Sequence, residues 1–267
     1  MTRFAFIVVA LVACGGSQTP ATTGAGQPTD PKISAAPANS TYTTAEQVLE
    51  ASLVAQGGRD KMGKLTGMKQ TGKISIAQMG ITGTMTGYAA PPRNALLVVE
   101  LPGIGKIVQG TKDDIVWETN PMTGARIITG PERATALRDA VFNADLKWKE
   151  LYPKVELAGV VDWNSQQAYK IIMTSTDGDV VTRYFAKDTV LPLGFEATFK
   201  SQMGAVPVSM VESDYREVGG IKFAHHLSRK DASAAIEITV DTIELSPQLD
   251  PKTFDLPPEI TALQKKS

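Results

Sequence analysis

The sequence predicts a mostly antiparallel β fold, in which a curled sheet of about eleven strands is interrupted by two helical inserts. Alternation of apolar and polar residues with a period of two runs through most of the chain after residue 68. Short turn sequences such as Pro91-Pro92 and Asp177-Gly178 connect these stretches. Short connections favour hairpins and therefore antiparallel pairing. A sheet of this size curls, and its concave face must be filled by side chains, helices or a ligand.

The chain begins with a short basic segment that ends at Arg3, and an apolar run follows from Phe4 to Ala13. Such a run is typical of a secretory signal and is too short to cross a bilayer core of about 30 Å. It ends in Leu11-Val12-Ala13-Cys14, which resembles a bacterial lipobox. Residues 1–13 are therefore predicted to be a lipoprotein signal peptide.

Cys14 is the single cysteine of the chain, so an intramolecular disulfide is excluded. The lipobox resemblance implies that the mature protein starts at Cys14 with a diacylglyceryl thioether and an amide-linked acyl chain, which together form a lasting membrane anchor. Gly15, rather than aspartate, follows the cysteine. This favours the outer membrane over the inner membrane. The alternative is an ordinary cleaved signal with an incidental cysteine.

Residues 14–40 are predicted to be a flexible linker. They contain four prolines among Gly, Ser, Thr and Ala, and Ile33 is their single large apolar residue. Such a segment buries too little apolar surface to offset the entropy of ordering it. We expect a folded domain over residues 41–258 and a short C-terminal tail over residues 259–267.

The composition argues against two classes of protein. The 27 Lys and Arg residues nearly balance 28 Asp and Glu, which gives a formal charge of −1. Without a basic excess or a polybasic block, nucleic acid is not an expected partner. No other apolar run reaches about 18 residues, so no transmembrane helix is predicted.

The domain is predicted to open with an amphipathic helix. Thr43 and Glu46 have the spacing of a capping box, and Gly57-Gly58 would end the helix. Its apolar stripe consists of Ala45, Val48, Leu49 and Leu53.

A second helix is predicted after Thr129, which has capping-box spacing to Glu132, with Pro131 near its start. Its apolar stripe is Ala134, Leu137 and Val141, and helix is expected to continue or resume into residues 145–151.

The remaining segments read as strands bounded by turns. In the last of them, Ile236, Ile238 and Val240 share one phase while Ile243 and Leu245 share the other, which predicts a β-bulge. The expected strand segments are 69–78, 81–88, 94–101, 106–109, 114–118, 126–129, 155–162, 167–175, 180–186, 193–200, 206–217, 221–228 and 235–245.

From Thr43 to Pro257 the chain resembles the LolA/LolB-like lipoprotein-localisation superfamily, whose wider membership includes the envelope-stress regulator RseB. The resemblance rests on the order and spacing of three features, none of which is a catalytic signature. They are the first helix ending in Gly57-Gly58, Trp117 after the Asp113-Asp114 turn, and the C-terminal run from Glu212 to Phe223 with the final strand and Phe254-Asp255-Leu256-Pro257 that follow it. The resemblance implies an unclosed β-barrel with helices as a lid over an apolar cavity that holds acyl chains.

Alternation predicts which side chains line this cavity, although a shift of one residue would move any of them to the other face. The candidates are Ile74, Ile76, Met85, Leu97, Val99, Trp117, Phe195 and Phe199. Outer-membrane members of the superfamily use an exposed apolar loop to deliver cargo, and the turn containing Leu101 and Ile104 is the candidate for such a membrane contact. The alternative is that both residues end strands and pack inward.

Motifs of enzymes, metal sites and cofactor sites are missing from the sequence. His225 and His226 are the only histidines, and neighbours in a strand point to opposite faces, so they cannot share a metal. Gly103-Ile104-Gly105 lacks the third glycine of a dinucleotide motif, and neither a Walker A loop nor GxSxG occurs. Asp113, Asp114, Asp177 and Asp179 fit ordinary turns better than a calcium site. We therefore expect no metal, no cofactor and no enzymatic activity.

Together these observations predict a monomeric lipoprotein that is anchored in the outer membrane, faces the periplasm and binds acyl chains of a lipid or lipoprotein. Its role would lie in lipoprotein sorting or envelope lipid handling. The alternative within the same fold is an RseB-like sensing module that binds an envelope protein and transfers no lipid. An envelope enzyme is the least favoured hypothesis.

Overall fold

The computed structural model describes residues 42–201, 204–232 and 234–265. The predicted signal peptide, the lipidation site Cys14 and the predicted linker lie outside the described residues. The accounts of these three features remain predictions.

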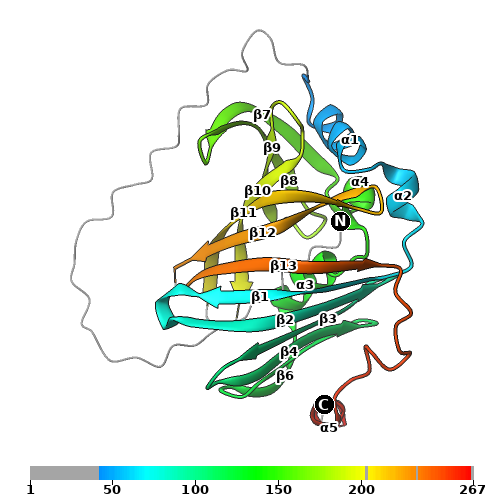
Figure 1. Cartoon of the computed structure of the whole chain (residues 1–267), viewed down its shortest axis with the longest axis vertical. Coiled ribbons are helices and arrows are strands. Elements are labelled where there is room, and N and C mark those ends of the chain that lie inside the picture. Colours follow the sequence, from blue (N-terminus) through cyan, green and yellow to red (C-terminus); the bar gives the residue numbers. More distant parts are fainter. Residues whose placement is uncertain (1–41, 202–203, 233, 266–267) are drawn as a thin grey trace, which may run out of the picture.

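One antiparallel sheet of thirteen strands makes up the body of the protein, in the order β6-β5-β4-β3-β2-β1-β13-β12-β11-β10-β9-β8-β7 (Figure 1). All the expected strand segments are present, but the expected total of about eleven is too low. The strands are Met68–Ile76 (β1), Ile81–Ala90 (β2), Asn94–Leu101 (β3), Gly105–Lys112 (β4), Ile115–Asn120 (β5), Gly124–Ile128 (β6), Lys154–Trp163 (β7), Gln166–Thr174 (β8), Val180–Ala186 (β9), Pro192–Ser201 (β10), Gly204–Val218 (β11), Ile221–Asp231 (β12) and Ala235–Leu245 (β13).

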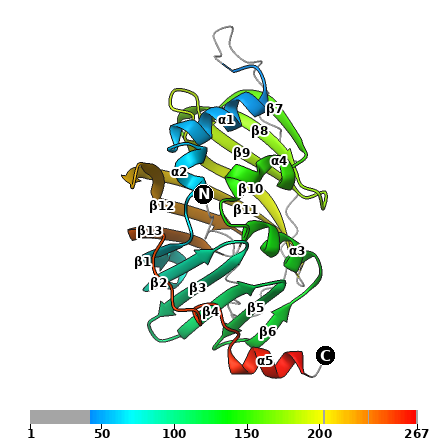
Figure 2. The ribbon, with the colours of Figure 1, turned by 90° about the vertical axis from the view of Figure 1, so that its right-hand side faces the viewer.

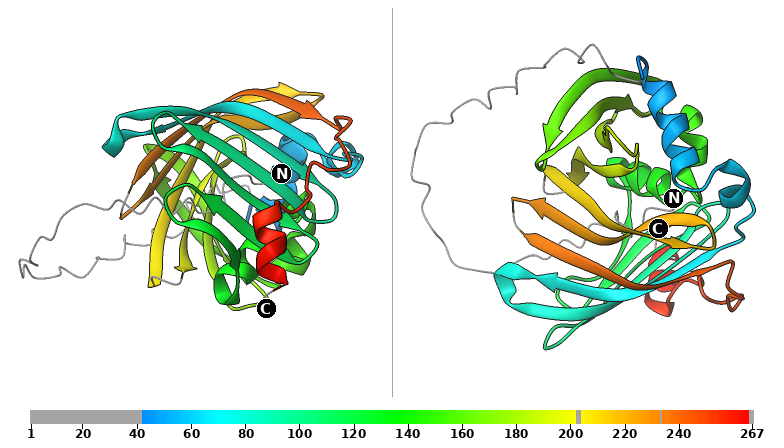
Figure 3. Two further views of the ribbon diagram at one scale, coloured as in Figure 1. Left: turned by 90° about the horizontal axis from the view of Figure 1, so that it is seen from below. Right: turned by 45° about the horizontal axis from the view of Figure 1, so that its top comes forward.

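The strand order describes two meanders that meet in the middle of the sheet. Strands β1 to β6 run outward to one edge, strands β7 to β13 return from the other edge, and β1 pairs with β13. Strands β6 and β7 are the two ends of the order, so the sheet curls without closing (Figure 3). The sheet thus has a concave inner face and a convex outer face.

The predicted bulge lies in β13. Thr71 pairs with Thr242 while Gly72 pairs with Val240, so Asp241 is an extra residue without a partner on β1. Because of this bulge, all five apolar residues of the two sequence phases face the same side of the sheet.

Two helices precede the sheet in the chain. They are α1 (Ala45–Ala55) and the short α2 (Arg59–Gly63). The expected capping box exists, but one residue later than predicted. Thr44 accepts a hydrogen bond from the Gln47 backbone N–H, and the Gln47 side chain accepts from the Thr44 backbone, so Thr43 and Glu46 are not the capping pair. The predicted stripe of α1 is buried against the inner face.

The chain crosses from β6 to β7 through residues 129–153, here called the crossover. It contains α3 (Gly130–Asp139), a short 3-10 helix η3 (Ala144–Lys147) and α4 (Trp148–Leu151), so the helix breaks after Asp139 and resumes rather than continuing. Figure 2 shows α1, α3 and α4 lying over the open side of the curled sheet. The crossover therefore bridges the two edges that the sheet leaves unpaired.

The start of α3 differs from the prediction. Thr129 is the N-cap residue but makes no capping hydrogen bond with its side chain. Glu132 instead pairs with Arg126 of β6, at 2.8 Å between Oε1 and Nη2, so the predicted capping box does not form.

The end of the chain carries a helix that the sequence analysis assigned to a tail. Helix α5 (Pro258–Gln264) lies beside β6 (Figure 2). Its Ile260 side chain is fully buried. Lys112 of β4 and Asp255 form an ion pair of 2.6 Å that holds the preceding segment. The predicted domain boundary at residue 258 thus coincides with the start of an ordered element.

Candidate lipid-binding face

The register of the sheet defines which side chains share its inner face. Met85 of β2 pairs with Val99 of β3, and Val99 pairs with Ile107 of β4. Paired residues point to the same side of a sheet, and positions two apart along a strand do so as well. The candidate residues can therefore be assigned to a face without reference to any ligand.

Five of the eight predicted cavity residues belong to one cluster of buried apolar side chains on the inner face. This cluster, here called the tip cluster, lies where β1 and β3 end and β2, β4 and β13 begin. Among the described residues, no helix contributes a side chain to it. Its members are Ile74, Ile76, Met85, Leu97, Val99, Leu101, Ile107, Ala234 and Ile236.

Phe195 and Phe199 belong to a second cluster on the inner face of the other meander. This cluster, here called the β10 cluster, also contains Val181, Val208 and Met210. A larger third cluster, the helix cluster, joins α1, α2 and the crossover to the sheet. Tyr152 and Leu227 pack against both the β10 and helix clusters, and Ile238 packs against both the tip and helix clusters. The apolar lining is thus connected across the inner face.

Trp117 is the one predicted cavity residue that faces the other way. Trp117 pairs with Gly110, and Gly110 pairs with Leu96, so these three residues share one face. Their strand neighbours Val116 and Leu97 lie on the inner face, so Trp117 lies on the outer face. Its indole lies directly over Gly110, where any Cβ atom would collide with the ring. The prediction was wrong because β5 has apolar residues in both phases, so alternation alone could not choose between its faces.

The proposed membrane-contact turn is also corrected. Leu101 is 3% exposed and belongs to the tip cluster, and Ile104 is half-buried against the same cluster. Leu101 is the last residue of β3, so the alternative of an inward-packing strand end holds for it. The turn itself still places Pro102 and Gly103 at the surface.

Helical residues of the crossover form part of the inner face. Phe142 and Trp148 are buried in the helix cluster, and Leu137 packs on Val116 and Ile128. The Trp148 indole N–H donates a hydrogen bond of 3.2 Å to Glu50 of α1. The crossover and α1 therefore cover the apolar face together.

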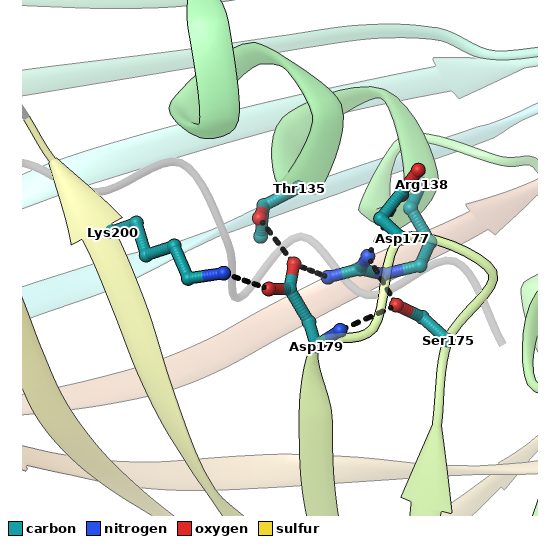
Figure 4. Close-up of polar contacts among 6 residues, drawn as sticks. All are labelled: Thr135, Arg138, Ser175, Asp177, Asp179 and Lys200. Atoms are coloured by element: carbon teal, nitrogen blue, oxygen red, sulfur yellow. Dashed lines mark hydrogen bonds and ion pairs between the residues drawn. The ribbon is translucent and has the colours of Figure 1, made fainter.

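Asp179, in the turn between β8 and β9, holds α3 against the sheet (Figure 4). It accepts hydrogen bonds from Arg138 at 3.1 Å, Thr135 at 3.1 Å and Lys200 at 2.9 Å. Burial alone would raise the pKa of Asp179, but the bonds from Lys200 and Arg138 hold this pKa below its usual value. The Arg138 guanidinium also donates to Ser175 at 3.0 Å.

A second buried ion pair links the crossover to the middle of the sheet. Arg183 of β9 donates a hydrogen bond of 2.8 Å to Asp145 of η3, and their side chains are only 6% and 11% exposed. Sequence reasoning missed this pair. The sequence did hold a signal for a buried charge. Arg183 alternates in phase with Val181 and Phe185, which face inward, so its charge must also face inward.

Polar side chains occupy the middle of the inner face of β4 to β6, between Ile107 at one end and Val116 and Ile128 at the other. Gln109 and Glu118 are buried and hydrogen-bonded to each other, and Arg126 lies between Glu118 and Glu132. The hydrogen bond with Glu132 raises the pKa of Arg126. The polar group therefore separates the tip cluster from the small apolar cluster of Val116, Ile128 and Leu137.

His225 and His226 point to opposite faces, as predicted. The buried His225 forms a hydrogen bond of 2.7 Å between Nδ1 and the Val240 carbonyl, while His226 is 3.2 Å from Glu237. No group of three or more potential metal ligands occurs in the part of the chain that the structure describes.

These features define a class: proteins with an open antiparallel half-barrel whose apolar inner face is covered by helices. No protein-family model matches the chain, and no curated protein matches it significantly. Among solved structures, it is similar to a DUF1329 family protein from Desulfovibrio piger, with a TM-score of 0.57, 15% identity, and coverage of 79% of this chain and 96% of that one.

Two further solved structures share the fold. One is a domain named for outer membrane lipoprotein sorting, from Vibrio parahaemolyticus, with a TM-score of 0.55, 15% identity, and coverage of 79% of this chain and 97% of that one. The other is a LolA superfamily protein from Nitrosomonas europaea, with a TM-score of 0.53, 14% identity, and coverage of 80% and 99%. The chain therefore has the LolA-type fold that the sequence resemblance implied.

Proposed function

We propose that this protein is a non-enzymatic carrier that binds the acyl chains of a lipid or lipoprotein on the inner face of its half-barrel. The observation that carries the proposal is the connected apolar lining. It extends from the tip cluster through Leu227, Ile238 and Tyr152 to the β10 cluster. Each buried CH₂ group of a ligand would contribute about 0.8 kcal/mol to binding on such a surface.

The crossover is the element that a ligand would displace. It is covalently continuous with the sheet only at β6 and β7, and it covers the inner face through a few large side chains. If an acyl chain replaces these side chains, the sheet exchanges one apolar contact for another, while Phe142 and Trp148 of the displaced crossover become more exposed to water.

The hairpin tips next to the tip cluster suit a lipid surface. Residues 77–80, 102–105 and 121–124, which connect β1–β2, β3–β4 and β5–β6, contain no charged residue. Met79 and Met122 on these tips are 40% and 48% exposed. By contrast, the turn between β4 and β5 at the opposite end of the same meander contains Asp113 and Asp114. We propose that these tips, rather than Leu101, contact the membrane.

Anchoring through a lipidated Cys14 in the outer membrane, facing the periplasm, completes the proposal. It is supported by the lipobox and by Gly15 after the cysteine. The 27 residues from Cys14 to Ser40, treated as a flexible coil, have a root-mean-square reach of about 25–30 Å. Such a tether would let the hairpin tips turn toward the anchoring membrane.

Native mass spectrometry tests acyl-chain binding. The chain from residue 14 onward, with Cys14→Ser, should be measured before and after delipidation and after addition of phospholipid or an acylated peptide. We expect one or a few bound lipid masses that delipidation removes. A chain that stays free of lipid throughout would contradict the proposal and favour the protein-binding alternative.

A matched pair of variants on β3 locates the site. Leu97 is buried on the inner face, and its neighbour Leu96 is half-buried on the outer face. Leu97→Gln should lower lipid affinity about tenfold, because a polar amide would be buried against the acyl chain without a partner. Leu96→Gln should leave the affinity unchanged, and equal effects of the two variants would place the lipid elsewhere.

A further inference from the structure

Two buried ion pairs hold the crossover against the sheet, and they have opposite polarity. In the first, the crossover supplies the cation, Arg138, and the turn between β8 and β9 supplies the anion, Asp179. In the second, the crossover supplies the anion, Asp145, and the sheet supplies the cation, Arg183. When the crossover lifts away from the sheet, Arg183 stays on the inner face and loses Asp145 as its partner.

Arg183 lies at the boundary between two apolar clusters. Its strand neighbours are Ile171, which belongs to the helix cluster, and Phe195, which belongs to the β10 cluster. Its guanidinium carbon is 4.8 Å from the centre of the Phe185 ring. A cation is thus fixed at one end of the apolar path formed by the β10 cluster.

Asp145 occupies only part of the hydrogen-bonding capacity of Arg183. Nη1 donates to Asp145, while Nε is buried and has no hydrogen-bond partner. A guanidinium presents its N–H groups as a planar fork that suits two oxygens of one carboxylate or phosphate. The present pair leaves a donor of that fork unused.

We propose that Arg183 binds the anionic end of an acyl ligand, and that Asp145 occupies the place of this anion while the protein is empty. This inference rests on the proposed function, which it makes more specific. The ligand is an amphiphile with one acyl chain on the β10 cluster and a carboxylate or phosphate at its polar end.

The energetics favour an anionic ligand over a neutral one. A buried guanidinium without an opposite charge is strongly unfavourable, and the cost of breaking a buried pair exceeds that of exchanging its anion. A ligand with an anionic end replaces Asp145 and keeps Arg183 paired. A neutral ligand of the same chain length displaces the crossover and leaves Arg183 unpaired.

The test compares three ligands that share an 18-carbon chain but differ at the polar end: oleate, oleoyl-lysophosphatidylglycerol and oleyl alcohol. Affinities are measured below micellar concentrations on the full mature chain with Cys14→Ser. We expect at least one of the two anionic ligands to bind about tenfold or more tightly than oleyl alcohol, because a charge-assisted hydrogen bond contributes to its binding alone. Preference for oleate would identify a fatty acid, and preference for the lysolipid a phosphodiester.

Three variants make the test specific. Arg183→Met should bring the affinities for anionic and neutral ligands to within about twofold of each other, because the paired cation is gone. Asp145→Asn should raise the affinity for the anionic ligand several-fold, since the internal competitor loses its charge. Arg216→Met removes the arginine of an exposed ion pair with Asp214 and should leave the preference unchanged.

Distinct results separate failure of this inference from failure of the proposed function. Equal binding of anionic and neutral ligands by the wild-type chain, or a preference that survives Arg183→Met, would overturn the role of Arg183 and leave acyl-chain binding intact. Binding of none of the three ligands would overturn both. If Arg183→Met fails to fold, Arg183→Lys serves in its place. It should keep a reduced preference for the anion, and an unchanged preference would overturn the inference.

Discussion

At the scale of single residues, three buried arginines of the inner face each form a close pair with an aspartate. Arg183 with Asp145, Arg138 with Asp179, and Arg229 with Asp231 are separated by 2.8, 3.1 and 2.7 Å. Replacing a buried pair by apolar residues is often neutral, whereas removing one partner is costly. The first two pairs therefore fix where the crossover docks more than they add to overall stability, whereas the third lies within β12.

The pair at Asp179 gives a prediction with a pH dependence. The pKa of Asp179 is lower in the folded protein than in the unfolded chain, where it is about 3.9. The carboxylate therefore stabilises the fold fully above the unfolded pKa, and this contribution is lost as the pH falls toward the folded pKa. Asp179→Asn should lower the free energy of unfolding by about 1–3 kcal/mol at neutral pH. Its deficit against wild type should shrink from about pH 5 to about pH 3.

Asp177→Asn is the matched control for this prediction. Asp177 also contacts Arg138, at 3.3 Å, but its side chain is 49% exposed. Exposed pairs contribute about 1 kcal/mol or less. Chemical denaturation measured across this pH range checks both variants, and equal losses for the two would contradict the importance of Asp179.

At the scale of elements, the crossover is the cover of the apolar face and should move when a ligand binds. Trp148 of α4 is 5% exposed and reports on this movement. In a chain that retains Trp148 as its only tryptophan, through Trp117→Phe and Trp163→Phe, saturating acyl ligand should shift the fluorescence emission to longer wavelength. Unchanged emission at saturation would show that the crossover stays in place.

The elements were largely predictable from the sequence, because period-two alternation and turn residues are local signals. The bulge opposite Gly72 followed from the phase switch between Val240 and Ile243. Helix α5 was missed because its seven residues lack a clear apolar stripe, and the burial of Ile260 depends on tertiary contact. The cap at Thr44 rather than Thr43 shows that consecutive threonines leave a helix start ambiguous by one residue.

The candidate site was predictable only in part. The five candidates in the tip cluster and the two phenylalanines of β10 lie in strands with clean alternation. Trp117 failed because β5 is apolar in both phases. The partner of Arg183 could not be found from the sequence, since Asp145 lies 38 residues away on a helical segment whose docking depends on the whole fold.

At the scale of the whole molecule, one end of the half-barrel should contact membranes. Met79→Asp combined with Met122→Asp should weaken binding of the Cys14→Ser chain to phospholipid vesicles several-fold, because charged side chains would have to be desolvated at the lipid surface. Val54→Asp is the control, since Val54 is 74% exposed on α1, outside the hairpin tips. Co-sedimentation measures both, and equal losses would contradict docking through the tips.

The central claim, that an acyl chain lies on the inner face of the half-barrel, is tested most directly by photo-crosslinking. A fatty acid with a diazirine on its chain is bound, irradiated and located by peptide mass spectrometry. The account predicts adducts on inner-face residues of the tip and β10 clusters, such as Val99, Phe195 and Met210. Adducts confined to outer-face residues such as Leu96, or the same adducts in protein unfolded before irradiation, would contradict it.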